Sequence, residues 1–582
     1  MRNGLPGKST PVSFSMSMCA LTLLCCAFNI HSLFAQKNLD WRYHGNDLSN
    51  QRFQDVDQIN PSNVAKLKPA WIFHTGVSDP NMSMEMTPIV TGGVMYVPTG
   101  DDDVFALDAA TGKQIWAYHP TDMPKLSTLP ICCNNDNRGV AVGDGKVFVA
   151  RLDATLVALN ANSGKVLWKT TVDLPGNGAS MTIAPQFADN KVIVGVSGAE
   201  YGVRGHVDAY NPGNGKLLWR FWTTEPTTWS GDSYLRGGAS VWTNPSYDPD
   251  LKTLYFPTGN AYPWPWAGNR GGTNLYASSI VAVDVKTGEL KWYFQDTHHD
   301  IWDFDGPQPI VLFDFHGTPA LSHTSKTGFM FILDRRTGHS LFPYKEVSVP
   351  TTPAWQLVWP TQPESSIESL TEHSATQDGE KLPSGYTAAP MWTPVQDAPM
   401  VFQPIFDGGM EWPPAAYSPR THFIYSHSRY LPFDIGITNV PAQDMNCPGP
   451  FGPGGCTWTG TFSIPGVTSH GVYGAVDTRT GKVAWKFPVT GAAPDSGVSV
   501  AGDLVFFGES NGLFHAADAK TGKILWTFDS STVPGAGGAN ASAAIYVVDG
   551  REYVVYGFGG NPGESPKLGD AVIAFALPDD DN

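Results

Sequence analysis

The chain has 582 residues, of which 41% are hydrophobic and 16% charged, so most of it can fold around a core. Its 37 basic and 54 acidic residues give a net charge of −17, and no basic block interrupts this balance, which argues against a nucleic-acid-binding protein. The 61 glycines, 47 prolines and 19 tryptophans predict many tight turns between short strands, and therefore an all-β protein.

The N-terminal segment has the pattern of a secretory signal peptide. Arg2 and Lys8 precede the apolar stretch MCALTLLCCAFNI, and SLFAQ follows. We therefore expect a signal peptide over residues 1–35, cleaved after Ala35, and a single mature domain over residues 36–582. The apolar stretch is short for a membrane span, and an uncleaved anchor is the alternative.

Export determines how the cysteines are interpreted. Three of the seven leave with the signal peptide, and Cys132, Cys133, Cys447 and Cys456 remain. An even number in an oxidising compartment predicts two disulfides, Cys132–Cys133 from adjacency and Cys447–Cys456 across a Gly/Pro-rich loop. An adjacent pair closes no long loop, so its entropic benefit is small and its presence needs another explanation. The chain contains no CxxCH motif, so we expect no covalently bound c-type haem.

A short sequence motif of the form AxDxxTGKxxW recurs along the chain. It is typical of an apolar strand, a turn in which glycine tolerates positive φ, and a further strand that carries an aromatic residue. Copies end at Trp116, Trp168, Trp219, Trp292, Phe342, Trp485 and Trp526, and an eighth position is expected at Trp71.

The spacing of the copies predicts a propeller. Most lie roughly 40–50 residues apart, which is the length of a four-stranded blade. We therefore predict an eight-bladed β-propeller of four-stranded blades with tryptophan-docking repeats, with seven blades as the alternative. The interval from Phe342 to Trp485 is long enough to hide a degenerate copy. The last strand, AVIAFALP, is expected to pair with the N-terminal segment and close the ring.

Four phrases stand among these repeats: the CC pair at 132–133, VSGAEYG, FPTGNAYPW and HHDIWDFDG. In this order, and with the tryptophan-ended repeats, they resemble the quinoprotein alcohol dehydrogenases. These are periplasmic enzymes that use pyrroloquinoline quinone (PQQ), and methanol dehydrogenase is a familiar member. The resemblance runs from DWRYHGNDLSNQRF to the C-terminus. The HHD phrase also resembles the PQQ glucose dehydrogenase branch.

PQQ is a flat tricarboxylic ortho-quinone, which needs flat surfaces, cations or hydrogen-bond donors, and a metal that polarises the quinone. The resemblance implies that Cys132 and Cys133 form a disulfide cap on one face of PQQ and that Trp242 lies against the other. It implies that Arg138 binds a PQQ carboxylate, a group that the guanidinium fork suits. The other cofactor-binding residues that it implies are Glu85, Thr182, Ser197, Gly198, Ala199, Ser240 and Lys326.

The resemblance also implies a metal site and a catalytic base. The implied ligands are Glu200, Asn260, Asp303 and Asp305, and Asp303 matches the catalytic aspartate. Hard oxygen ligands suit Ca²⁺ or a lanthanide ion. A second aspartate at position 305 is associated with lanthanide-using methanol dehydrogenases, whereas the likeness to the glucose dehydrogenase branch keeps Ca²⁺ open.

Two positions depart from the family pattern. Glu411 stands where asparagine is expected, next to Trp412, and Pro494-Asp495-Ser496 stands where a tryptophan is expected. An added carboxylate beside an anionic cofactor needs a proton, a metal or a cationic partner. Both changes bear on the substrate more than on the cofactor.

The resemblance implies oxidation of a primary alcohol to an aldehyde in the periplasm. Asp303 would take the hydroxyl proton, and hydride would pass to C5 of PQQ. Because the chain has no haem motif, we expect an external electron acceptor, either a cytochrome c or a membrane quinone. One alternative is a PQQ-dependent aldose or polyol dehydrogenase with a sugar substrate. Another is a non-catalytic propeller scaffold of the outer-membrane assembly type. A homodimer is a further expectation.

Overall fold

The computed structural model describes residues 38–77, 79–438 and 457–578. The predicted signal peptide (1–35) and the predicted Cys447–Cys456 pair lie outside the described residues. The described residues form one compact unit. No helix in the described ranges has the length and apolar character needed to cross a membrane.

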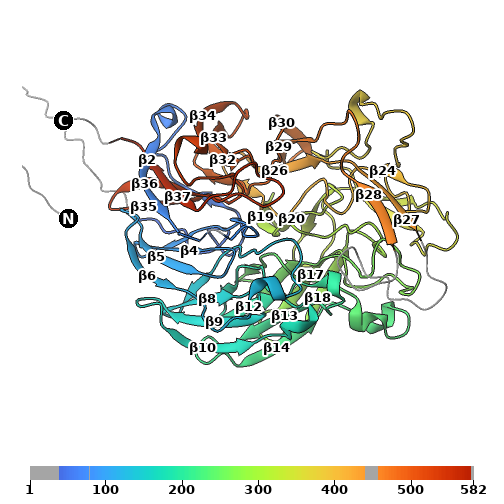
Figure 1. Ribbon diagram of the computed structural model, residues 1–582, viewed down its shortest axis with the longest axis horizontal. Helices are drawn as coiled ribbons and strands as arrows, with labels where there is room; N and C mark the ends of the chain where they lie inside the picture. The colour runs from blue at the N-terminus through green and yellow to red at the C-terminus, as the bar shows by residue number, and fades with distance from the viewer. Residues whose placement is uncertain (1–37, 78, 439–456, 579–582) are drawn as a thin grey trace, which may run out of the picture. The chain divides into compact units, whose positions relative to one another are not determined.

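The described residues form strands and short 3₁₀ turns. The 3₁₀ turns span Val64–Lys66, Leu126–Thr128, Pro175–Asn177, Ala199–Tyr201, Pro226–Thr228, Ser233–Arg236, Gln377–Gly379 and Ser530–Thr532. Four consecutive antiparallel sheets each contain one of the first four complete repeats in their last two strands (Figure 1). Their strands are β3 (Ile89–Thr91), β4 (Val94–Pro98), β5 (Val104–Asp108) and β6 (Gln114–Tyr118); β7 (Ala141–Gly143), β8 (Lys146–Ala150), β9 (Thr155–Asn160) and β10 (Val166–Thr171); β11 (Gln186–Ala188), β12 (Lys191–Gly195), β13 (His206–Tyr210) and β14 (Leu217–Trp222); β15 (Ser246–Asp248), β16 (Thr253–Pro257), β17 (Ser279–Asp284) and β18 (Leu290–Gln295).

Four more sheets complete the series of eight in the described residues. Their strands are β19 (Val311–Phe315), β20 (Thr318–Thr324) and β21 (Met330–Asp334); β25 (Ala416–Ser418), β26 (Phe423–Tyr430), β29 (His470–Asp477) and β30 (Lys482–Thr490); β1 (Phe53–Gln54), β31 (Ser499–Ala501), β32 (Leu504–Gly508), β33 (Leu513–Asp518) and β34 (Ile524–Asp529); β2 (Lys68–His74), β35 (Ala544–Val548), β36 (Arg551–Phe558) and β37 (Ala571–Ala576).

The two ends of the described chain share one sheet. Strand β37 pairs antiparallel with β2, from Lys68 opposite Ala576 to His74 opposite Ala571, as the sequence predicts for AVIAFALP. Figure 1 shows blue β2 beside red β36 and β37. Strands of neighbouring sheets contact one another, as at β3 with β35, β31 with β35, β25 with β31 and β19 with β25. Sheets arranged in this way and closed by the chain ends form a β-propeller.

The aromatic residue that ends a repeat lies on the turn of the next sheet. Its indole N–H donates to a backbone carbonyl of that turn at six of the eight positions, over 2.9–3.3 Å. These six residues are Trp71, Trp116, Trp168, Trp219, Trp292 and Trp485. In each of the six turns, the glycine has positive φ, and a Cβ built on it would lie 2.5–2.6 Å from a ring atom. The recurring glycine therefore leaves room for the preceding sheet's indole.

This docking can be tested with two glycines of similar conformation. Gly164 has φ 67°, and a Cβ there would lie 2.5 Å from Trp116 Cε3, whereas Gly145 has φ 70° and nothing within 4 Å of its Cβ position. Alanine at either site costs about 1–2 kcal/mol of backbone strain. Gly164→Ala should lose a further ~1–3 kcal/mol, because the methyl group displaces the indole. Denaturant unfolding measures both losses, and equal losses would contradict the docking.

Two sheets differ from the predicted four strands. The β19–β21 sheet has three strands, since after Ser340 bridges Leu333 the chain leaves the sheet at Phe342. The β31–β34 sheet has five, because β1 adds to β31 in parallel. The described part of the interval from Phe342 to Trp485 contains no hidden repeat copy. Beside strands of the β25–β30 sheet it holds the hairpin β22 (Tyr344–Ser348) with β23 (Thr361–Ser365) and a sheet of β24 (Met400–Phe402), β27 (Phe433–Thr438) and β28 (Thr457–Thr461).

The hydrophobic core lies mainly between neighbouring sheets. One buried cluster joins Tyr96 and Val104 of one sheet to Val147 and Val157 of the next. Because each sheet buries its faces against its neighbours, the strand faces are not available to a ligand. A binding site can therefore be lined by the loops that precede the strands.

Candidate active site

All fifteen residues that the resemblance assigns to the cofactor and the metal line one cavity of about 780 Å³. Several come from equivalent places in the propeller. Glu85, Thr182, Trp242 and Trp412 each lie four residues before the first strand of a sheet, and Arg138 lies three residues before β7. The repeat therefore brings residues far apart in the sequence into one cavity.

Trp242 is held in place by Asp305. The indole Nε1 donates to Asp305 Oδ2 over 2.7 Å, and Asp305 Oδ1 accepts the backbone N–H of Asn260 over 3.0 Å. Gly259 permits this approach, since a Cβ there would lie 2.9 Å from Asp305 Oδ2. Asp305 thus fixes the orientation of a flat ring that lines the cavity.

Arg138 lies between two indole rings with part of its guanidinium unpaired. Its Cζ lies 5.0 Å from the ring centroids of both Trp242 and Trp412, within cation–π range. Its Nη2 donates to Glu85 Oε2 over 2.6 Å. Its Nε and Nη1 are buried without a hydrogen-bond partner in the described residues. Unpaired buried cationic donors beside a flat ring fit a planar ligand that carries carboxylates, as PQQ does.

The adjacent cysteines also border this cavity. A disulfide joins Cys132 to Cys133, and both residues line the cavity. Cys133 and Asn134 have positive φ, 67° and 78°, so the chain turns sharply at the pair. The Asn134 side chain donates to Asn561 Oδ1 over 3.3 Å, which ties this loop to a segment near the C-terminus.

Lys326 faces three carboxylates. Its Nζ lies 3.8 Å from Asp303 Oδ2, 3.7 Å from Asp305 Oδ1 and 3.6 Å from Glu411 Oε1. Burial opposes the charge of Lys326, yet these carboxylates raise its pKa well above the usual value. Burial also raises the pKa of Asp303 well above its usual range, although Lys326 lowers it in part. Asp303 has φ 65°, a strained conformation that is common at functional sites.

The predicted metal ligands lie in the same cavity but do not form a ready coordination shell. In the described ranges, no three His, Cys, Asp or Glu side chains are gathered closely enough to hold a metal ion. Asp303 and Asp305 face Lys326 instead. Glu200 follows Gly198, which has φ 116°, and burial raises the pKa of Glu200. The donors suit a hard cation in kind, and their assignment as ligands stays a prediction.

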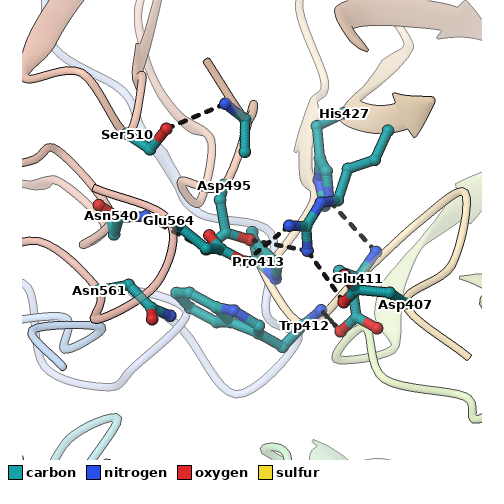
Figure 2. A network of polar contacts seen from close by, with 12 residues as sticks. Asp407, Glu411, Trp412, Pro413, His427, Asp495, Ser510, Asn540, Asn561 and Glu564 are labelled. Atoms are coloured by element: carbon teal, nitrogen blue, oxygen red, sulfur yellow. Dashed lines mark hydrogen bonds and ion pairs between the residues drawn. The ribbon is translucent and has the colours of Figure 1, made fainter. Parts of the chain in front are cut away.

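The two departures from the family pattern have cationic partners. Glu411 faces Lys326, and Asp495 lies 3.8 Å from Arg429. Arg429 also reaches Asp407 Oδ1 at 3.4 Å and Glu564 Oε1 at 2.6 Å. Figure 2 shows Asp407, Asp495 and Glu564 in one polar network. Asp495 is fully buried and does not line the cavity, whereas Arg429 and Glu564 do.

Sequence reasoning missed several residues that line the cavity. The polar ones are Asn134, Asp136, Ser180, Asp407, Arg429, Asn561 and Glu564, and the aromatic ones are Trp264, Phe406, Phe433 and Phe462. Burial raises the pKa of Asp495 well above its usual range, and the neighbouring charge of Glu564 adds to the shift. Asp495 lies four residues before β31, the same offset from a strand as Glu85, Thr182, Trp242 and Trp412. This offset could have indicated that Asp495 lies near the cavity.

Comparison with known proteins agrees with this fold. The family model described as PQQ glucose/ethanol/alcohol dehydrogenase, beta-propeller domain, matches residues 41–448. A model described as outer membrane protein assembly factor BamB matches residues 469–565.

Two relatives and one solved structure illustrate the likeness. Quinohemoprotein alcohol dehydrogenase ADH IIB of Pseudomonas putida is 33% identical over 607 residues, covering 96% of this chain and 82% of that protein. The lanthanide-dependent methanol dehydrogenase of Methylorubrum extorquens is 34% identical over 508 residues, covering 79% and 78%. A europium-containing methanol dehydrogenase structure superposes with a TM-score of 0.77 at 27% identity, covering 92% of this chain and 98% of that one.

The propeller and its cavity define an oxidoreductase of the quinoprotein class. The chain belongs to the PQQ-dependent alcohol dehydrogenase family, which confirms the resemblance noted in its sequence.

Proposed function

We propose that this protein oxidises a primary alcohol to an aldehyde in the periplasm, with PQQ and a Ca²⁺ or lanthanide ion in the cavity. The observation that carries the proposal is the convergence of Asp303, Lys326, Trp242, Arg138 and the cysteine pair on one cavity. The names of the relatives support an alcohol as substrate. We interpret the eight sheets as eight blades with docked aromatic residues.

The roles of the chain's own residues follow from their contacts. When bound, PQQ supplies an ortho-quinone that accepts hydride, so the alcohol loses two electrons and two protons. Asp303 accepts the hydroxyl proton on its carboxylate, and Lys326 stabilises that carboxylate from 3.8 Å. Arg138 binds a cofactor carboxylate through its unpaired Nε and Nη1.

The remaining cavity residues shape the cofactor's slot. Trp242, oriented by Asp305, presents its flat ring to one face, and the Cys132–Cys133 disulfide covers the other. Glu200, Asn260, Asp303 and Asp305 would hold the metal ion. The two electrons pass to an external acceptor, a cytochrome c or a membrane quinone, and the acidic chain favours a basic partner.

A PQQ-dependent aldose or polyol dehydrogenase is the second candidate. The description of the matching family model includes glucose dehydrogenases, and the HHDIWDFDG phrase supports this alternative. The scaffold hypothesis predicts loss of the cysteine pair and of the metal carboxylates, and both are present.

Reconstitution separates these candidates. Periplasmically expressed protein, loaded with PQQ and either CaCl₂ or LaCl₃, should reduce an artificial dye when primary alcohols are added, and the metal that supports turnover identifies the native ion. Protein without PQQ is the control and should be inactive. Glucose oxidation without alcohol oxidation would support the aldose candidate. If neither alcohols nor sugars lead to dye reduction, the enzyme proposal is refuted.

A further inference from the structure

Four aromatic residues, Trp264, Phe406, Phe433 and Phe462, line one part of the cavity and are called the aromatic wall below. Their rings form a continuous series, with centroids 5.2 Å apart for Trp264 and Phe406, 4.8 Å for Phe406 and Phe433, and 4.3 Å for Phe433 and Phe462. Trp264 and Phe433 are buried, whereas Phe462 is 41% exposed. The aromatic wall therefore runs from the interior of the protein to its surface.

The aromatic wall is continuous with the residues that support Asp303. Trp302 and Phe304, on either side of Asp303, belong to the same buried hydrophobic cluster as Trp264 and Phe433. The rings of Trp302 and Phe304 stack with centroids 5.7 Å apart. Asp303 and the aromatic wall line the same cavity, so one substrate can contact both.

The aromatic wall comes largely from chain that the propeller repeat does not require. Phe433 begins β27 and pairs with Phe402 of β24, and Phe462 follows the end of β28. Asp434 pairs with Thr461, which brings Phe433 and Phe462 to the same end of this small sheet. The sheet lies in the long interval before Trp485, and the propeller closes through β2 and β37 without it.

Apart from Trp242 and Trp412, which flank Arg138, the residues described in the rest of the cavity lining are polar or small. Arg429, with Asp407 and Glu564, supplies charged groups, and Lys326 faces its three carboxylates. Pockets of roughly 300–1,000 Å³ enclose drug-sized ligands. A cavity of about 780 Å³ is in the upper part of that range, so it leaves space beside a flat cofactor for more than methanol.

We propose that the aromatic wall binds the carbon skeleton of the substrate, and that the preferred substrates are primary alcohols carrying an apolar group of phenyl size. This inference rests on the proposed function of the same cavity. The aromatic wall removes the apolar group from water and offers edge-to-face ring contacts, neither of which methanol can use. The hydroxyl group then points toward Asp303.

Competition between two alcohols tests the inference. For the PQQ-loaded protein, kcat/KM for benzyl alcohol should exceed that for ethanol, and Phe462→Ala should lower their ratio by about tenfold, chiefly by lowering kcat/KM for benzyl alcohol. Phe462→Leu should retain most of the preference. Tyr344→Ala is the matched control, because Tyr344 is similarly exposed at 45% but lies outside the cavity lining. An unchanged ratio in Phe462→Ala and in Phe433→Ala would overturn the inference.

Binding of unreactive alcohols separates this inference from the proposed function. 2-Phenyl-2-propanol and 2-methyl-2-propanol share a tertiary hydroxyl group that cannot be oxidised to a carbonyl. Ligand-observed NMR should show tighter binding of the phenyl compound, weakened about tenfold in Phe462→Ala. If this holds while no alcohol is oxidised, the proposed function fails and the subsite stands. If Phe462→Ala slows only reduction of a cytochrome c acceptor, the aromatic wall is a partner-docking surface and the inference is wrong.

Discussion

Asp303→Asn is expected to lower kcat by about a thousandfold, within the range that a general base contributes. Asparagine keeps the size and the strained turn of Asp303 but cannot accept the hydroxyl proton. The neighbouring Trp302 and Phe304 stay buried, so the fold should persist. Steady-state kinetics of the PQQ-loaded variant, with PQQ content measured in the same sample, tests this expectation.

The matched control for this substitution is Asp314→Asn. Asp314 is an exposed residue of β19, the strand that follows the Asp303 loop, and its side chain accepts the N–H of Gly317. The control should keep kcat within about threefold of the unmodified protein. If Asp303→Asn retained more than about a tenth of the activity, another group would have to be the base.

Arg138→Met should weaken PQQ binding by about ten- to a hundredfold. The substitution removes a cation whose Nε and Nη1 are unpaired and buried, and hydrogen bonds to a charged group contribute about 1.5–3 kcal/mol. Methionine keeps a chain of similar length between Trp242 and Trp412. Quenching of tryptophan fluorescence during titration with PQQ measures the affinity.

Removing Arg138 also leaves Glu85 without its cationic partner, and that effect needs its own control. The double variant Glu85→Gln/Arg138→Met removes both charges, so stability lost to an unpaired Glu85 should recover while the affinity for PQQ stays low. Arg138→Lys should restore part of the affinity, since it keeps the charge but loses the fork. Unchanged affinity in Arg138→Met would place the PQQ carboxylates elsewhere.

The repeat could be predicted because its determinants are local. The turn glycine and the aromatic residue recur in sequence, and each is explained by one contact, such as Trp116 over Gly164. The pairing of AVIAFALP with the N-terminal segment followed from the need to close the sheets. The residues around the cavity came from the family resemblance, and the four-residue offset before each first strand explains why several of them meet.

What the sequence did not predict depends on contacts between distant segments. Arg429 reaches Glu564, 135 positions away, and no local pattern relates the two. Phe342 ends a repeat copy, yet its sheet keeps only three strands, because the chain turns there into the β22–β23 hairpin. The aromatic wall escaped prediction because Phe406, Phe433 and Phe462 lie in the interval from Phe342 to Trp485, which has no repeat period, and Trp264 was noted only as part of FPTGNAYPW.

A crystal structure of the protein reconstituted with PQQ and its metal ion would show whether the cavity is the cofactor site. We expect one PQQ in the cavity, stacked between the Trp242 ring and the Cys132–Cys133 disulfide, with a carboxylate on Arg138 and the metal ion beside Glu200 and Asp303. A structure with PQQ outside this cavity, or with the space between Trp242 and the disulfide filled by protein side chains, would contradict this expectation.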